Sequence, residues 1–292
     1  MCSIVCNTDV EQRSSQAVVV AVSSQAVFDS ETEPDPGLPD LLKKGPAFSF
    51  IEAVQQVNKK LLDKNPAETL LFDVILLSND SKDTNSKIIA SVKHYGLAIG
   101  RFCFCNKDDN IESLQSSDAK LFLSTDRNDV FSASQQGIPS ALLFPQQDWE
   151  QQDWKELKVV FSGDAIGFSQ DDLSSLRGQG FTEPQLQSLK AAKDSVKEFA
   201  VQMGEMRSRF GLVGSPLRAG LVTVWGSRDV CARALRTLRG WGVLVDEAFS
   251  LAGAPPSPIL RLLQPHVLCV DGLFLAPGGA TLGEGGWRDG VM

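Results

Sequence analysis

Val159-Val-Phe-Ser-Gly-Asp-Ala165 is a short segment in which apolar residues give way at once to polar ones. Val and Phe favour extended structure, and an uninterrupted apolar run is typical of a strand that is covered on both faces of a parallel sheet. In an open α/β sheet, ligands bind at the carboxyl ends of the strands. The segment therefore predicts both a strand of a parallel sheet and a candidate site around Asp164.

On both sides of this segment, apolar runs alternate with stretches of helical periodicity along the chain. Further strands are predicted at 17–22, 72–77, 99–105, 120–123, 220–224, 243–245 and 267–270. Helices are predicted at 48–62, 85–95, 191–210 and 230–241, where apolar residues recur at helical spacing. Alternating strands and helices are the signature of an α/β protein with a parallel, Rossmann-like sheet.

The second half of the chain repeats the pattern of the first. Val-Ile-Leu-Leu-Ser78 matches Ala-Gly-Leu-Val-Thr223, and His94-Tyr-Gly96 matches Gly240-Trp-Gly242. A polar tandem repeat of Gln-Gln-Asp-Trp at 145–155 separates the halves. We expect a flexible tail at 1–15, an N-terminal Rossmann-like lobe at 16–150 and a second lobe at 156–292, either as two lobes or as one integrated domain. The alternative is that any two α/β units look alike.

Composition narrows the classes of partner. The 292 residues carry a formal net charge of −8, which argues against nucleic acid or an anionic membrane as the main partner. No basic start followed by an apolar run precedes the first strand, so no signal peptide is expected. The six cysteines are scattered without metal-type spacing, and we interpret them as free thiols of a reducing, cytoplasmic protein.

Polar side chains follow three of the predicted strands. Asp164 follows the strand at 158–161, Thr223 follows Leu221-Val222, and Asp271 follows Cys269-Val270. Because the carboxyl ends of parallel strands meet at one edge, these side chains are plausible neighbours. Two carboxylates and a hydroxyl in one crevice could hold Mg²⁺ and a phosphate. Strand-terminal Asp and Thr are also common in ordinary loops, so spacing alone leaves the alternative open.

Several longer stretches carry a family resemblance that covers residues 17–291. They are Lys43-Lys-Gly-Pro-Ala-Phe-Ser-Phe-Ile-Glu-Ala-Val-Gln-Gln-Val-Asn-Lys-Lys-Leu61, His94-Tyr-Gly-Leu97 with Arg101-Phe-Cys103, Arg236-Thr-Leu-Arg-Gly-Trp-Gly242, Asp246-Glu-Ala248, and Leu251-Ala-Gly-Ala-Pro255 with Gln264-Pro-His266. In this ordered set the chain resembles the cytosolic 5′-nucleotidase I family, a branch of the haloacid dehalogenase-like phosphatases. The resemblance implies a haloacid dehalogenase-like second lobe and hydrolysis of nucleoside 5′-monophosphates, AMP above all, with Mg²⁺.

The mechanism that the resemblance implies needs two aspartates in the pattern Asp-Gly-Asp. The first attacks phosphorus, and the second protonates the leaving oxygen and then activates water. A strand-end Thr holds the phosphoryl oxygens, a Lys offsets their charge, and a pair of Asp residues with the nucleophile holds Mg²⁺.

Part of this machinery is kept. Asp164 occupies the acid/base position, and Thr223 with the backbone near Gly163 occupies the phosphate-holding position. Asp271 falls on the second of the paired metal aspartates, so Asp271 and, weakly, Asp164 are the candidate metal ligands.

The rest is replaced. The nucleophile position holds Ser162, the lysine position Pro256, and the first metal aspartate Val270. Trp225 stands where the family usually has Arg. A serine without a base is a poor nucleophile, and neither serine nor valine supplies the anionic oxygen that Mg²⁺ prefers. Mg²⁺ binding is therefore expected to be weak.

Two hypotheses follow. The chain is either a divergent 5′-nucleotidase with weak Mg²⁺-dependent activity, in which Asp164 serves as base for an attacking water, or a pseudoenzyme. The second would be a noncatalytic nucleotide-binding or assembly subunit, forming homo-oligomers or hetero-oligomers with active relatives. The joint loss of nucleophile, lysine and one metal ligand favours the second.

Overall fold

The computed structural model describes residues 3–7, 16–29, 41–106, 109–143, 156–178, 182–211 and 214–269. The chain divides into two compact units. The first comprises Met1–Asp126 with Leu142–Leu157, and the second comprises Arg127–Ala141 with Lys158–Met292. Asp271 and Val270 lie outside the described residues. The predicted division into lobes at 150–156 stays a prediction.

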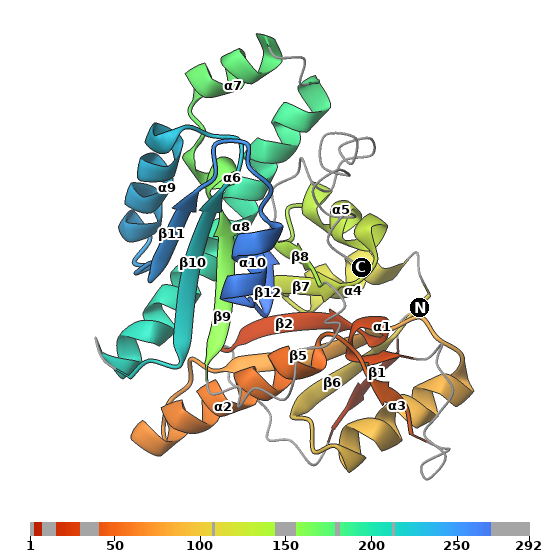
Figure 1. Cartoon of the computed structure of the whole chain (residues 1–292). Coiled ribbons are helices and arrows are strands. Elements are labelled where there is room, and N and C mark those ends of the chain that lie inside the picture. The colour runs from red at the N-terminus through yellow and green to blue at the C-terminus, as the bar shows by residue number, and fades with distance from the viewer. Residues whose placement is uncertain are drawn as a thin grey trace. The chain divides into compact units, whose positions relative to one another are not determined.

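The first unit is built on a mainly parallel sheet with strand order β1-β6-β5-β2-β7 (Figure 1). Its strands are β1 (Ser3–Cys6), β2 (Val18–Ser23), β5 (Phe72–Ser78), β6 (Ile99–Phe104) and β7 (Leu121–Ser124). Its helices are α1 (Ser24–Val27), α2 (Phe48–Lys64), α3 (Lys82–His94) and α4 (Asn110–Ser116), and β3 (Phe28–Asp29) pairs with β4 (Lys43–Lys44). Every residue of β5 is buried, Asp73 and Ser78 included.

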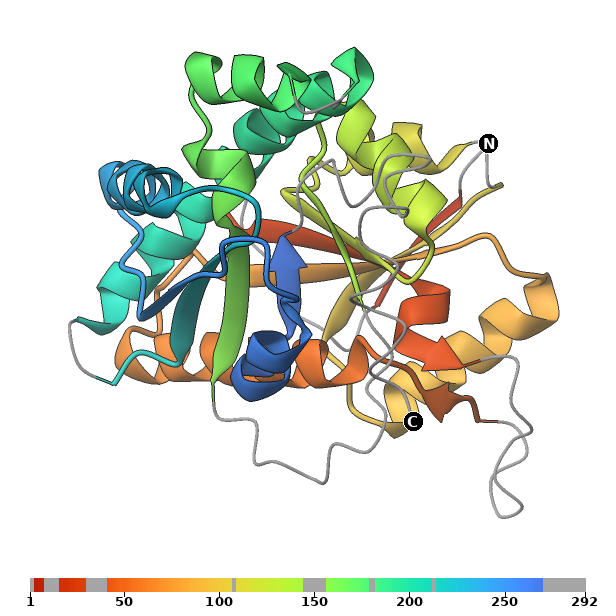
Figure 2. The ribbon, with the colours of Figure 1, turned by 45° about the horizontal axis from the view of Figure 1, so that its top comes forward.

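The second unit repeats this plan with strand order β8-β12-β9-β10-β11 (Figure 2). Its strands are β8 (Ser140–Leu142), β9 (Leu157–Ser162), β10 (Leu217–Thr223), β11 (Glu247–Ser250) and β12 (Val267–Cys269). Its helices are α5 (Arg127–Gln135), α6 (Gly163–Gly167), α7 (Gln170–Gly178), α8 (Glu183–Phe210), α9 (Arg228–Gly240) and α10 (Ser257–Leu263). The parallel α/β class that the sequence predicts is confirmed.

The two units share one topology. When β1 and β8 are left aside, the earliest strand of each unit (β2 or β9) is central. The next two strands lie in order on one side and the last lies on the other: β6-β5-β2-β7 in the first unit and β11-β10-β9-β12 in the second. The carboxyl end of this central strand is thus the point where strand order reverses, which is where open α/β sheets bind ligands. An internal repeat, as the matching sequence segments suggest, predicts this identity of order.

Two sequence expectations differ from the structure. Ser3–Cys6, expected in a loose tail, forms β1 and pairs antiparallel with β6 because its apolar, β-prone residues find an open strand edge. The strand predicted at 243–245 is wrong, since the strand forms at Glu247–Ser250.

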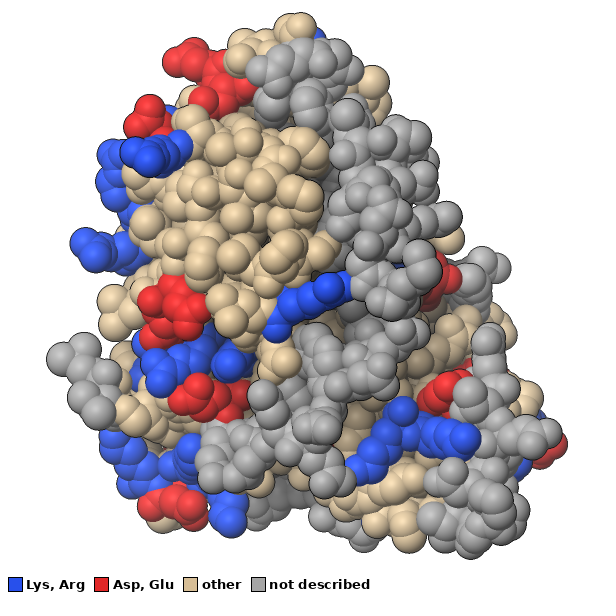
Figure 3. Space-filling model, viewed as in Figure 1, with Lys and Arg blue, Asp and Glu red and all other residues tan. Residues whose placement is uncertain are grey.

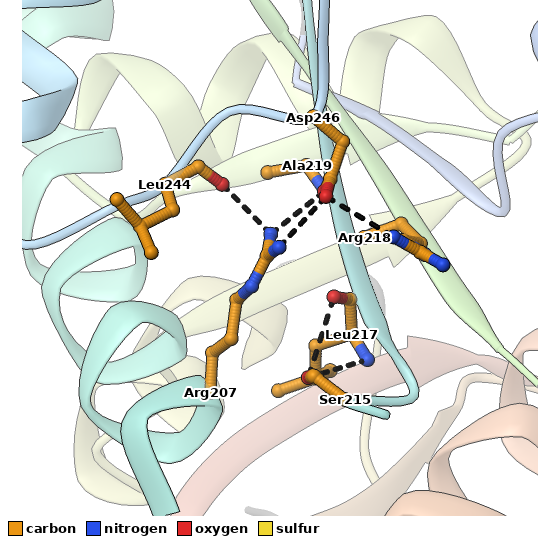
Figure 4. A network of polar contacts seen from close by, with 7 residues as sticks. All are labelled: Arg207, Ser215, Leu217, Arg218, Ala219, Leu244 and Asp246. Carbon is orange, nitrogen blue, oxygen red and sulfur yellow. Dashed lines mark hydrogen bonds and ion pairs between the residues drawn. The ribbon is translucent and has the colours of Figure 1, made fainter. Parts of the chain in front are cut away.

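The reason for the displaced strand is a polar network around Asp246 (Figure 4). Arg207, near the end of α8, donates to both carboxylate oxygens of Asp246 at 2.7 Å and to the Leu244 carbonyl at 2.7 Å. The Ala219 amide also donates to Asp246, at 2.8 Å. Burial alone would raise the pKa of Asp246, but these hydrogen bonds outweigh it and lower the pKa. The strand register with β10 begins at Glu247, directly after Asp246, whose own amide donates to the Ala219 carbonyl at 2.8 Å.

Among the described residues, no helix combines the length and the apolar character that crossing a membrane requires.

Candidate active site

The end of β9 runs directly into helix α6. Ser162, the last strand residue, is the N-cap of α6, and its hydroxyl accepts a hydrogen bond from the Ala165 amide at 3.4 Å. Ser, with its short side-chain oxygen, is among the preferred N-cap residues. The residue at the nucleophile position of the family pattern is 7% exposed and takes part in ending the strand and starting the helix.

Asp164 points away from solvent into the loop that follows β10. Its Oδ2 accepts from the Val224 amide at 2.7 Å, its Oδ1 from the Gly226 amide at 2.7 Å, and the Trp225 amide is shared between them at 3.1 and 3.3 Å. The side chain has 0% exposure. Both carboxylate oxygens are therefore engaged by backbone donors of one neighbouring loop.

Two influences of opposite sign act on the pKa of Asp164. Burial, the larger influence, raises the pKa, because removal from water disfavours the charged form. The amide hydrogen bonds from Val224, Gly226 and Trp225 lower it, and the net direction is upward. A raised pKa is typical of functional acids, but it also arises wherever a carboxyl is buried for structural reasons.

Thr223 and Gly163 are pressed together at the ends of β10 and β9. A Cβ at Gly163 would lie 2.0 Å from the Thr223 Oγ1 and 3.2 Å from its Cβ, so only glycine fits without displacement. Thr223 is fully buried, and within the described part of the chain its hydroxyl has no hydrogen-bond partner. Buried hydroxyls normally find a partner, so this one is an exception that needs explanation.

Two further glycines hold α6 against α9, and sequence reasoning missed both. A Cβ at Gly167 would lie 2.2 Å from the Val230 carbonyl oxygen, and one at Gly226 would lie 2.5 Å from the Val230 Cγ1. In the sequence, each of them is only a glycine close to a predicted strand end. Their role becomes clear in the structure, where both loops face Val230. The loops are thus locked by close backbone contact.

An ion pair fastens the outer side of the same junction. Arg233 of α9 is paired with Asp172 of α7 and donates to the Gly167 carbonyl at 2.9 Å. Ser169 and Asp172 cap each other's amides at the start of α7, in the reciprocal manner of a capping box. Burial works to raise the pKa of Asp172, but the hydrogen bonds from Ser169 and the charge of Arg233 outweigh it and lower the pKa.

The loops at this end of the second unit are almost free of charge. In segments 162–170, 223–227 and 250–260, Asp164 is the only Asp, Glu, Lys or Arg. Trp225 packs between two apolar clusters, and Pro256 is buried just before α10. Figure 3 shows the resulting largely uncharged surface over α6, α10 and the loops beside them. A dianionic phosphate therefore meets no cation on these segments.

The described side chains do not fit a magnesium site. Among the residues that the structure describes, no three His, Cys, Asp or Glu side chains gather around one point. Both oxygens of Asp164 are engaged by amides, and Ser162 offers no carboxylate. Asp271, the other candidate ligand, lies outside the described residues. The magnesium expectation stays a prediction, and no chemistry of the described residues depends on it.

The motif stretches in the first unit contact one another. Phe48 and Tyr95 pack edge to face with ring centroids 5.4 Å apart, and Lys44 lies 4.1 Å above the Phe48 ring. Gln55 accepts from the Ala98 amide and donates to the Gly96 carbonyl, each at 3.2 Å. These residues hold α2 against the turn after α3.

The mainly parallel α/β sheets, with an Asp and a Thr at adjacent strand ends, are consistent with the Rossmann-like, haloacid dehalogenase-type class. A model of the 5′-nucleotidase family matches residues 37–273, and the chain belongs to that family. It is 36% identical over 254 residues to human cytosolic 5′-nucleotidase 1B, which agrees with the type I branch that the motifs indicate.

That alignment covers 84% of this chain but 42% of the relative. The chain therefore spans well under half the length of the curated relative that it matches. No solved structure matched.

Proposed function

We propose that this chain is a noncatalytic member of the 5′-nucleotidase family, which retains the fold and a nucleotide-monophosphate-type crevice but not the hydrolytic step. Nucleoside monophosphates such as AMP are the ligands that the family suggests. The expected role is that of a cytoplasmic nucleotide-binding or assembly subunit, paired with itself or with active relatives.

The position of the Asp164 carboxylate carries this proposal. A general acid must come within hydrogen-bond reach of the oxygen that it protonates. Asp164 is fully buried, and each of its oxygens has a short bond to a backbone amide. To reach a leaving oxygen it would have to abandon these donors, each of which would then be buried without a partner. Its role here is to join two loops.

The other positions support the same conclusion. Ser162 would need a base to become a nucleophile. The buried histidine of the second unit, His266, uses Nδ1 to accept the Lys158 amide at the opposite, amino end of β9. No cation on segments 162–170, 223–227 or 250–260 replaces the lysine that Pro256 displaces. Loss of one preorganised group typically costs about 10²–10³ in rate, and loss of the nucleophile more.

The decisive experiment is phosphate release from AMP by the purified full chain, with and without Mg²⁺. We expect no release above a heat-denatured blank from protein that circular dichroism shows to be folded. The matched variant is Thr223→Ala, which removes the hydroxyl but leaves the Asp164 hydrogen bonds in place. Release that is abolished in Thr223→Ala would overturn the proposal and restore the hydrolase alternative.

A further inference from the structure

The loop after β10 has the geometry of an anion-binding nest. Val224, Trp225 and Gly226 are consecutive residues whose amides all point at one carboxylate. Successive backbone N–H groups of this kind form concavities that bind anions. The 13-residue helix α9 begins just beyond, at Arg228, so its N-terminal dipole adds to the positive potential.

A buried hydroxyl stands at the start of this nest. Thr223 immediately precedes the three amides, is fully buried, and has a hydroxyl without a hydrogen-bond partner among the described residues. A hydroxyl followed by three convergent amides is a donor set for an oxyanion. Here the amides are satisfied from within the chain, and the hydroxyl is left over.

We propose that the Asp164 carboxylate is a resident anion, which occupies the Val224–Gly226 nest and keeps external oxyanions out of it. The contact blocks the nest: phosphate cannot bind to these three amides for as long as the carboxylate is seated. This inference deepens the proposed function, because it explains what Asp164 does in place of chemistry.

The Asp164 carboxylate fits the Val224–Gly226 nest closely. Each carboxylate oxygen has one amide at 2.7 Å, within the short range that is usual for bonds to charged acceptors. Gly163, which precedes Asp164, is clamped against Thr223, and this fixes the direction in which the carboxylate leaves the chain. An external anion would have to displace the Asp164 carboxylate, whose position is already set by the chain. The displaced carboxylate would then be buried without its hydrogen bonds, which costs free energy.

Chemical rescue tests the proposal. Asp164→Gly removes the carboxylate and leaves a cavity of its size, and formate, acetate and inorganic phosphate are then added at constant ionic strength, with chloride as the reference anion. We expect Tm to fall by roughly 10 °C, because two buried donors, Val224 and Gly226, and the part-buried Trp225 amide lose their acceptor. Formate should recover a substantial part of that loss, and the wild type should show no such anion-dependent shift.

The matched control is Asp172→Ala. It also removes a carboxylate that is hydrogen-bonded near α6, but one held by Ser169 and Arg233 rather than by a nest. Its Tm should respond to formate no more than to chloride. Equal rescue of both variants, or rescue of neither, would overturn the proposal.

A second variant covers the case in which Asp164→Gly does not fold. Asp164→Asn keeps the volume of the side chain but replaces one carboxylate oxygen by an NH₂ group. One of the two closest amides, Val224 or Gly226, then faces another donor and has no acceptor. Calorimetric titration with inorganic phosphate should detect binding to Asp164→Asn at least tenfold tighter than to the wild type. Equal affinity for the two proteins would contradict the inference.

The result is separable from that of the AMP assay. Hydrolysis by the wild type would defeat the proposed function and leave the rescue result standing, whereas an inactive wild type without rescue would defeat only this inference.

Discussion

The same junction is built in opposite ways in the two units. In the first unit, Asp80 follows the second strand and reaches back: its Oδ2 accepts from Ser24 at 2.7 Å and from Ser78 at 2.9 Å. In the second unit, Asp164 follows β9, and its side chain reaches forward to the amides of the loop after β10. Asp80 thus joins the segments that follow β2 and β5, and Asp164 joins those that follow β9 and β10.

The difference lies in what the carboxylate binds. Asp80 is partly exposed and bonds to side-chain hydroxyls, whereas Asp164 is fully buried and bonds to backbone amides. A hydroxyl can rotate to another acceptor if the first is lost, as Ser78 can toward the Asn85 Oδ1 at 2.7 Å, but a backbone amide cannot. A carboxylate at this junction can therefore serve only to join the two loops. The presence of Asp164 does not by itself indicate catalysis.

The largest expected effect comes from removing the buried carboxylate. Asp164→Ala should lower the free energy of unfolding by about 4 kcal/mol, because two buried amides and one part-buried amide are left without an acceptor. Urea unfolding followed by circular dichroism measures this. A loss below about 1 kcal/mol would mean that water reaches the nest, and the two junctions would then be energetically alike.

The next effect is the loss of stability in acid, which the buried His266 of the second unit should cause. Burial, followed by the charge of Lys158, lowers the pKa of His266 to about 4, from 6.5. Because the folded pKa is depressed, the stability that this histidine contributes is full above pH 6.5 and is lost as pH falls toward 4. The shift corresponds to about 3 kcal/mol.

Asn is the matched replacement for this histidine, since its Oδ1 can accept the Lys158 amide in place of Nδ1 without titrating. His266→Asn should flatten the dependence of unfolding free energy on pH between 6.5 and 4. A slope unchanged from that of the wild type would place the acid sensitivity elsewhere.

The clamp between Gly163 and Thr223 has no counterpart in the first unit, where Ser24 carries a side chain at the corresponding helix start. Gly163→Ala should cost about 2 kcal/mol, because the new Cβ would lie 2.0 Å from the Thr223 Oγ1. In the double variant with Thr223→Ala the loss should be smaller than the sum of the single losses. Simple additivity in this double-mutant cycle would show that the clash is relieved by movement elsewhere.

The sequence predicted the long elements well because apolar periodicity reports burial directly. Helix α2 and strand β5 follow from their patterns alone, whereas β11 was misplaced because Val243-Leu-Val245 is apolar but the chain there is fixed by the side chain of Asp246. Helices α1 and α6 are too short to show a period.

The candidate site was predictable in its members but not in its geometry. Asp164 and Thr223 both stand at strand ends, and the structure brings them to adjacent loops. The partners of Asp164 are backbone amides, which every residue carries, so no letter of the sequence marks them. The close approach of Gly163 to Thr223 likewise depends on how two distant strands pair.

The smallest expected effect is at the junction of the first unit. Asp80→Ala should cost about 1 kcal/mol, because Ser24 and Ser78 lose a partly solvated acceptor that water can replace in part. Asp80→Asn, which keeps one acceptor oxygen, should recover about half of that loss. Measured in the same urea series as Asp164→Ala, the ratio of the two losses tests the comparison itself. Equal losses would mean that the amide nest is no more demanding than a pair of hydroxyls, and burial rather than donor type would then have to explain why Asp164 is held as it is.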